Sequence, residues 1–163
     1  MRKYTLSKSD SSEIIEFVNK KWPANVLPRK LKGIQVVEVE ENHSLLSGEN
    51  FLAVQVEKTI LPLLANEDVL KSFPGVNVDM GAIRFVCNGA KVMRPGIVKM
   101  DEFNKDDIVV IKDDTHGKYL AVGIALVSSN EAQTMSKGPV VENMHYVSDK
   151  FWEACKADKQ LGN

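Results

Sequence analysis

The stretch Val78-Asp-Met-Gly-Ala-Ile-Arg-Phe-Val-Cys-Asn-Gly-Ala-Lys-Val-Met-Arg-Pro-Gly-Ile-Val98 decides how this chain folds. Its apolar residues recur at positions i, i+3, i+4 and i+7, namely Ile83, Val86, Cys87 and Ala90. This spacing places them on one buried side of about two helical turns. Gly89 stands where a helix often ends in a left-handed turn, and the apolar segment that follows breaks at Pro95-Gly96. We therefore expect a strand, a short helix, a tight glycine turn and another strand.

The same stretch has the composition of a ligand-binding surface. The small residues that let a ligand approach the backbone are Gly81, Ala82 and Gly96. Positive charge for phosphate comes from Arg84, Lys91 and Arg94. Arg84 and Asn88, four residues apart, are expected to share a second face of the helix. A plainer interpretation stays open on these local features, in which the glycines serve turns and the cations are solvated.

Two sequence blocks are similar to a known family. Met80-Gly-Ala-Ile-Arg-Phe-Val86 and Asn88-Gly-Ala-Lys-Val-Met-Arg-Pro-Gly-Ile97 resemble the beginning of a PUA domain, an RNA-binding module of pseudouridine synthases and archaeosine transglycosylases. Lys137-Gly-Pro-Val-Val-Glu-Asn-Met-His-Tyr-Val-Ser-Asp149 resembles the closing strand of one branch of that family. That branch contains stand-alone archaeal PUA proteins and their eukaryotic relatives, the malignant T-cell-amplified proteins and ligatin. The blocks come in the family's order.

The expected fold class is α+β, with a small α/β N-terminal domain packed on a C-terminal PUA-like β-barrel. We assign residues 1–75 to a domain like the one that precedes PUA in the related translation proteins. Residues 76–152 form the PUA domain, and 153–163 form a polar tail, lightly docked from Ala154 onward. Pro74-Gly75 marks the boundary, and so short a connection implies close packing of the two domains.

Patterns in the first half predict a mixture of helices and strands. Asp10 and Glu13 resemble a capping pair at the start of a helix that Pro23 ends. Strands are expected over 34–39, 44–47 and 51–56, and a capped helix over 66–73.

The second half is rich in strands. Residues 107–112 and 118–127 are expected to form a hairpin around the turn 113–117. Gly123 indicates a bulge of the kind that small barrels need. A helical turn is expected over 129–135 and a further strand over 139–147. Short strands with one early helix favour a small closed or half-open barrel.

Charge and composition limit the function classes. The chain has 21 basic and 22 acidic residues and a net charge of −1, which disfavours nonspecific duplex binding through bulk charge. Any RNA contact therefore needs a local patch. The N-terminus lacks the apolar core of a signal peptide, and no apolar run approaches the roughly 20 residues that cross a bilayer. We expect a cytoplasmic protein without a membrane partner, whose two cysteines, Cys87 and Cys155, are reduced.

Sequence motifs for catalysis are missing. Gly89–Gly96 lacks the Gly-Lys-Ser/Thr ending of a phosphate loop, and there is no Gly-x-Ser-x-Gly or His-Glu-x-x-His motif. Asp113-Asp114 falls at a strand end, where neighbouring side chains point to opposite faces, so we interpret it as a solvated turn and not a metal site. His116 is expected in a turn, and His145 as a structural histidine in a strand. We expect no catalytic residues, cofactor or metal.

The resemblance implies an RNA-binding site, carried over residue by residue. Its members are Gly81, Ala82, Arg84, Asn88, Gly89, Lys91, Met93, Arg94, Pro95 and Gly96, joined by Lys137 and Gly138 from the closing block. Recognition of structured RNA, such as tRNA or rRNA, would depend mainly on shape. Related two-domain proteins associate with the small ribosomal subunit and initiator tRNA, which implies a role in translation.

An alternative function stays open. The chain is then a protein-interaction adaptor without a physiological RNA ligand, using an adaptable apolar surface. Candidate residues for that surface are Met80, Met93, Met100 and Met144. Salt dependence separates the two hypotheses, because phosphate binding weakens steeply as salt rises and apolar docking does not.

Overall fold

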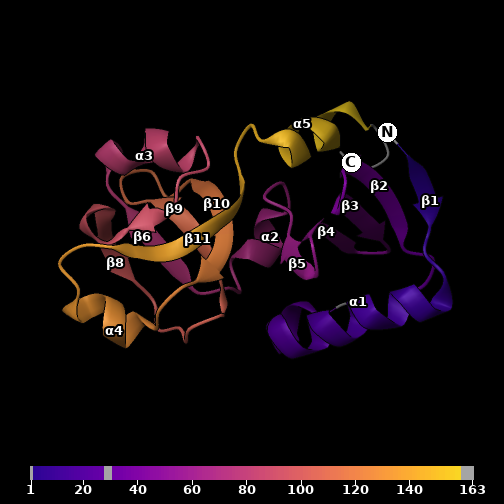
Figure 1. Ribbon diagram of the computed structural model, residues 1–163, viewed down its shortest axis with the longest axis horizontal. Coiled ribbons are helices and arrows are strands. Elements are labelled where there is room, and N and C mark those ends of the chain that lie inside the picture. The colour runs from indigo at the N-terminus through magenta and orange to yellow at the C-terminus, as the bar shows by residue number, and fades with distance from the viewer. Residues whose placement is uncertain (1, 28–30, 159–163) are drawn as a thin grey trace.

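The protein is built from two β-sheets, one in each half of the chain (Figure 1). A computed structural model describes residues 2–27 and 31–158. Sheet A has five strands in the order β1-β2-β3-β4-β5, with every neighbouring pair antiparallel. Its strands are β1 (Lys3–Thr5), β2 (Gln35–Glu40), β3 (His43–Gly48), β4 (Phe51–Val56) and β5 (Thr59–Pro62).

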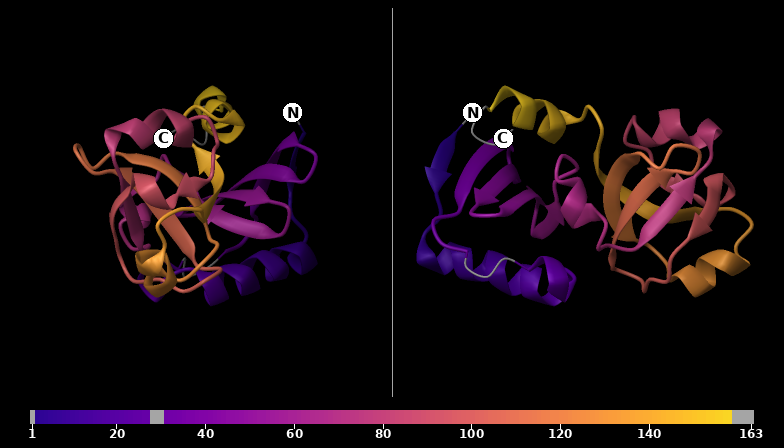
Figure 2. Two further views of the ribbon diagram at one scale, coloured as in Figure 1. Left: turned by 60° about the vertical axis from the view of Figure 1, so that its left-hand side comes forward. Right: turned by 180° about the vertical axis from the view of Figure 1, so that it is seen from behind.

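Helix α1 (Lys8–Lys21) runs along one side of sheet A (Figures 1 and 2). The helix begins earlier than the sequence suggested, because Ser7 is the capping residue and its Oγ accepts from the Asp10 N–H at 3.1 Å. The helix ends just before Pro23, as expected. Trp22 is buried there, and its Nε1 donates to the Ile60 carbonyl at 3.0 Å. These contacts fix α1 against β5.

Short helical segments complete the N-terminal half. They are the 3₁₀ turn η1 (Ala24–Val26) and helix α2 (Glu67–Leu70). The helix expected over 66–73 is therefore a single turn, and its apolar end residues Leu70 and Phe73 are buried in the core beneath sheet A. Packing of these two side chains, not helix length, holds this segment in place.

Sheet B has six strands and curls into a nearly closed barrel in the order β7-β11-β10-β9-β6-β8. Only the β6–β9 pair is parallel among these strands. The elements of this half are β6 (Gly75–Val78), α3 (Met80–Val86), β7 (Val92–Met93), the 3₁₀ turn η2 (Arg94–Gly96), β8 (Ile97–Met100), β9 (Ile108–Asp113), β10 (Tyr119–Ala125), α4 (Ser129–Thr134) and β11 (Pro139–Tyr146). The edge strands β7 and β8 follow each other in the chain through η2, which brings the two edges of the sheet together.

The predicted hairpin between β9 and β10 is confirmed, but one of its turn residues is not solvated. Asp113 is buried, and its carboxylate accepts from the backbone N–H groups of His116 and Lys118. The hydrogen bond from His116 is the main reason that the pKa of this carboxyl lies below its usual value. The buried Asp113 carboxylate thus stabilises the turn by bonding two of the backbone N–H groups that follow it, whereas Asp114 is exposed.

The bulge predicted at Gly123 is confirmed. Val122 pairs with His145 and Gly123 pairs with Asn143, so β11 carries one extra residue, Met144, between them. A Cβ atom on Gly123 would lie 2.1 Å from the Glu142 carbonyl oxygen. Only glycine lets β10 and β11 approach this closely.

The two halves pack on each other through a shared core. Ile108, Val110 and Val122 of the barrel are buried in the same cluster as the apolar residues of sheet A. The close packing expected from the short connection at Pro74-Gly75 is therefore present. No helix among residues 2–27 and 31–158 is long and apolar enough to cross a membrane.

The chain returns to the N-terminal half after the barrel. Helix α5 (Lys150–Ala157) lies beside β2 and β3 (Figure 1). It joins the last residues assigned to the PUA domain, 150–152, to residues 153–157, which were expected to belong to a lightly docked tail. Phe151, Ala154 and Cys155 are buried in the N-terminal core. The sequence suggested a tail because polar residues separate these apolar ones, yet they fall on one helical face. Residues 159–163 of the expected tail lie outside the described residues.

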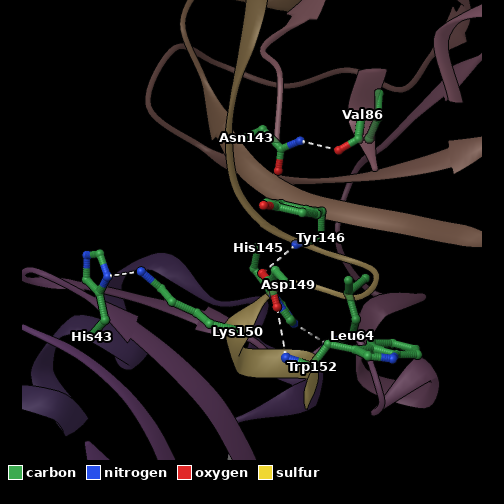
Figure 3. Close-up of polar contacts among 9 residues, drawn as sticks. All are labelled: His43, Leu64, Val86, Asn143, His145, Tyr146, Asp149, Lys150 and Trp152. Atoms are coloured by element: carbon green, nitrogen blue, oxygen red, sulfur yellow. Dashed lines mark hydrogen bonds and ion pairs between the residues drawn. The ribbon is translucent and has the colours of Figure 1, made fainter. Parts of the chain in front are cut away.

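His145 fastens this returning segment to the first half (Figure 3). The side chain is fully buried, and its Nε2 accepts from the Leu64 N–H at 3.1 Å. Its Nδ1 lies 2.8 Å from Asp149 Oδ2, so the tautomer that satisfies both contacts carries the proton on Nδ1. His145 is thus a structural histidine, as the sequence indicated.

Replacing His145→Ala is expected to lower the free energy of unfolding by roughly 2–4 kcal/mol, because it opens a cavity and leaves the Leu64 N–H and the Asp149 carboxylate without this partner. Urea denaturation followed by far-UV circular dichroism measures the change. The matched control is His116→Ala at an exposed turn, with an expected change within about 0.5 kcal/mol. Equal stability of the two variants would contradict the assigned role of His145.

Candidate nucleic-acid interface

Helix α3 begins beside the 3₁₀ turn η2. Asp79 caps the helix by accepting the Ala82 N–H on Oδ1 at 2.9 Å, while its own N–H donates to the Gly96 carbonyl at 2.9 Å. A Cβ atom on Gly96 would lie 3.0 Å from the Ala82 Cβ. The small residues of the key stretch therefore let α3 and η2 approach each other.

A groove of about 530 Å³ lies between α3, β7 and η2. Six of the predicted site residues line it, namely Gly81, Ala82, Lys91, Met93, Pro95 and Gly96. Asp79, Phe85, Val86, Ala90 and Val92 complete the lining. Helix α3 lies on the outside of the barrel, and the described elements of the N-terminal half stand beside the barrel without covering this helix (Figures 1 and 2). The N-terminal half therefore leaves this groove open.

The short helix and the glycine turn after it are present, although the helix ends before Cys87, Asn88 and Ala90, which were expected to lie on its faces. Helix α3 ends at Val86, and Gly89 has the left-handed φ of +89°. A Cβ atom there would lie 2.9 Å from Cε1 of Tyr146, so glycine is required for space as well as for conformation. Of the predicted buried stripe, Val86 is buried, Ile83 and Cys87 are half-buried, and Ala90 is exposed.

Two further predicted site residues, Asn88 and Gly138, lie in different parts of the barrel. Asn88 is exposed but lies beyond the end of α3, so it does not share a helix face with Arg84 as expected. Gly138, which also has a left-handed φ of +104°, accepts the Arg94 N–H on its carbonyl at 2.8 Å. Pro139 pairs with Met93. The closing block therefore reaches η2 and brings Lys137 to this end of the barrel.

The four predicted cations have different environments. Arg84 is exposed and lies over the Phe85 ring at 4.8 Å from its centre. Lys91 is exposed, with Nζ 3.6 Å from Glu142 Oε2, and Lys137 is also exposed. Arg94 is half-buried, and its guanidinium donates from Nε to the Ala132 carbonyl at 2.6 Å and from Nη1 to the Ile97 carbonyl at 3.3 Å. Arg94 therefore joins η2 to α4 and β8, and three cations remain exposed.

Exposed apolar side chains occur in the segment that contains the groove, and two of them, Phe85 and Met93, line it. The large hydrophobic residues with the greatest exposure are Met80 at 69%, Phe85 at 53%, Val98 at 53% and Met93 at 46%. Phe85 was not among the predicted site residues. The sequence did carry a signal for it, because Phe85 falls outside the apolar spacing of its helix. Met100 and Met144 are half-buried and pack against the two cores.

Both cysteines are free thiols, one in each half of the protein. Cys87 packs against the barrel core, and Cys155 is buried in the N-terminal core. Burial raises the pKa of both thiols, and Asp158 adds to the effect at Cys155. Such thiols are poor nucleophiles, which fits a packing role.

Comparisons with known proteins agree with this architecture. The PUA domain family profile matches residues 74–147. An uncharacterized protein of Methanocaldococcus jannaschii is 35% identical over 93% of this chain and 95% of that protein. Translation machinery-associated protein 20 of Schizosaccharomyces pombe is 32% identical over 66% of this chain and 63% of its own length.

Malignant T-cell-amplified sequence 1-A of Xenopus laevis is 30% identical over 80% of this chain and 76% of that protein. Among solved structures, a hypothetical protein of Pyrococcus horikoshii superposes with a TM-score of 0.76 at 31% identity, covering 94% of this chain and 99% of that one. The Methanocaldococcus jannaschii and Pyrococcus horikoshii proteins cover 93% and 94% of this chain, so the similarity extends over both of its halves. The chain therefore belongs to the family of PUA-domain proteins that includes the malignant T-cell-amplified sequence proteins.

Proposed function

We propose that this protein binds structured RNA in the groove between α3, β7 and η2. The observation that supports this most directly is the meeting of small residues and exposed cations at one open site. Gly81, Ala82 and Gly96 line the groove, and Lys91 lies on its wall. Small residues let a phosphate backbone come close to the protein chain, and the cation neutralises its charge.

Apolar surface beside the cations supplies the second part of binding. Phe85 lines the groove and is exposed, with the Arg84 guanidinium over its ring. An exposed aromatic ring beside a cation gives unpaired bases a surface on which to stack. With a net charge of −1, the chain depends on this local combination and not on bulk charge. Recognition then follows RNA shape.

The proposed setting is translation. Its support is a relative named translation machinery-associated protein 20, which is 32% identical over 66% of this chain. Within this setting we propose tRNA or rRNA as the ligand, the small ribosomal subunit as the place of action, and the cytoplasm as the compartment. The sequence-based expectation that the chain is not an enzyme stays a prediction.

A protein-interaction adaptor remains the second candidate function. The exposure of Phe85 and Met93 in one groove favours it, because exposed apolar patches often mark protein contacts. The two candidates differ in their response to salt. RNA binding weakens as salt rises, whereas apolar docking does not.

The double variant Arg84→Ala with Lys91→Ala is expected to lower affinity for an in vitro transcribed tRNA by about 1–3 kcal/mol, because two charge-assisted phosphate contacts are lost. The slope of log affinity against log salt should become shallower by roughly 1–2. Fluorescence anisotropy at several salt concentrations measures both quantities.

The control for this experiment is Lys20→Ala with Lys21→Ala, which removes two exposed cations from the end of α1. This pair should bind the tRNA as the wild type does. Affinity that falls equally in both double variants would show that the groove is not the site. Wild-type protein that binds no tRNA or rRNA fragment, yet retains salt-insensitive protein binding, would favour the adaptor.

Arg94→Ala is expected to affect stability as well as binding. The guanidinium holds two carbonyl groups, so its loss should lower the free energy of unfolding by about 1–3 kcal/mol. Arg84→Ala, whose side chain is exposed, should change that energy by less than about 0.5 kcal/mol. Thermal and urea unfolding of the two variants test the difference. If Arg94→Ala unfolds like the wild type, Arg94 is available to the ligand in the same way as Arg84.

A further inference from the structure

The turn between α3 and β7 sets the position of two parts of the groove. It connects Phe85 and Val86 on the helix to Lys91 on the other side. The turn has its own backbone bonds, from the Gly89 N–H to the Val86 carbonyl and from the Ala90 N–H to the Phe85 carbonyl, each at 3.0 Å. A change in this turn therefore moves the groove wall and the cation relative to each other.

Asn143 of β11 spans the two ends of this turn. Its Nδ2 donates to the Val86 carbonyl at 2.9 Å (Figure 3) and to the Ala90 carbonyl at 3.1 Å. Neighbouring β11 residues also contact the turn region, because Tyr146 lies against Gly89 and Glu142 pairs with Lys91. Three residues of β11 thus contact the turn region, and among them the amide of Asn143 bonds both ends of the turn, at Val86 and at Ala90.

The amide of Asn143 is not explained by packing of the strand. Its Oδ1 is buried and accepts no hydrogen bond within the part of the chain that the structure describes. Burying an amide oxygen in this way costs free energy that an apolar side chain of similar size would avoid. The hydrogen bonds of this side chain go to the turn, which is where a reason for the amide must lie.

The two carbonyl groups do not require Asn143 as their partner. The Val86 carbonyl also accepts from the Gly89 N–H, and Ala90 is exposed, so its carbonyl is within reach of water. Providing these two carbonyl groups with a hydrogen-bond donor is therefore not the main role of the Asn143 amide. The effect of the amide is geometric. Because Nδ2 of Asn143 bonds both carbonyl oxygens, it fixes the distance between Val86 and Ala90 on either side of Gly89.

From these contacts we infer that Asn143 is a positioning residue for ligand binding, an inference that rests on the proposed RNA-binding function. The amide holds the glycine turn so that Lys91 and the Phe85 wall face the ligand together. β11 is a firm base for this, because His145 and Asp149 fasten its far end to the N-terminal half. Asn143 itself does not contact the ligand.

The test compares Asn143→Leu with wild type, both as the full chain, using the in vitro transcribed tRNA as the probe. Leucine keeps the size and removes the donor together with the unpaired oxygen. Affinity should fall by roughly fivefold to twentyfold, which corresponds to the loss of about one phosphate or stacking contact when Lys91 and Phe85 are no longer held together. Unfolding in urea should be unchanged or shifted to higher urea concentration. Hydrogen exchange should accelerate at the Gly89 and Ala90 amides and not at the Leu46 amide in β3.

Two further variants sharpen the comparison. Asn143→Gln keeps an amide donor and should bind more tightly than Asn143→Leu. Asn77→Leu removes another strand amide of sheet B, whose Nδ2 bonds Asp114 and not the turn, and it should bind as the wild type does.

Each alternative result has a distinct meaning. If the wild type binds and Asn143→Leu binds equally well, Asn143 has no positioning role while the proposed function stands. If Asn143→Leu loses affinity only together with global stability, with faster exchange at Leu46 as well, the role is structural and the inference is overturned. If the wild type itself binds no tRNA, the proposed function fails first, and the inference falls with it.

Discussion

The carboxylate of Asp149 is the constraint on which the arrangement of the two halves depends. Its Oδ2 accepts from His145 Nδ1 and from the Tyr146 N–H, and its Oδ1 accepts from the Trp152 N–H, each at 2.8 Å. One buried group thus ends β11, starts α5 and orients the histidine that bonds Leu64 (Figure 3). Because a buried carboxylate is stable only with such partners, the three contacts are coupled.

This coupling reaches the candidate site through β11. The strand pairs with β7 at Met93, bonds the glycine turn through Asn143 and ends at the contact with Leu64. The extra residue Met144 lies between Asn143 and His145, and such a bulge redirects neighbouring side chains. Because of this bulge, Asn143 of β11 can bond the glycine turn beside the groove while His145 of the same strand bonds Leu64 in the N-terminal half.

The sequence predicted those features that depend on local chemistry. The β9–β10 hairpin follows from turn residues between apolar runs, and the bulge at Gly123 follows from a glycine inside a strand. Six residues that line the groove could be predicted because they lie in one stretch that resembles the PUA family, whereas Phe85 was missed. Where the sequence failed, the cause was a partner far along the chain. Arg94 is held by Ala132 of α4. Residues 154–157 of the predicted tail belong to helix α5, because Ala154 and Cys155 pack in the core of sheet A.

The low net charge of the chain bears on what the groove can select. A protein with a net charge of −1 has little long-range attraction for polyanions, so a ligand must contact the exposed cations closely to gain from them. Lys91 is already paired with Glu142, and a phosphate must displace or share that partner. Any regular duplex offers phosphates, but a groove lined by Gly81, Phe85 and Met93 also needs apolar contact. Under the proposed function, RNA that presents both a phosphate and an accessible base or sugar edge is expected to bind this groove more tightly than a uniform RNA helix.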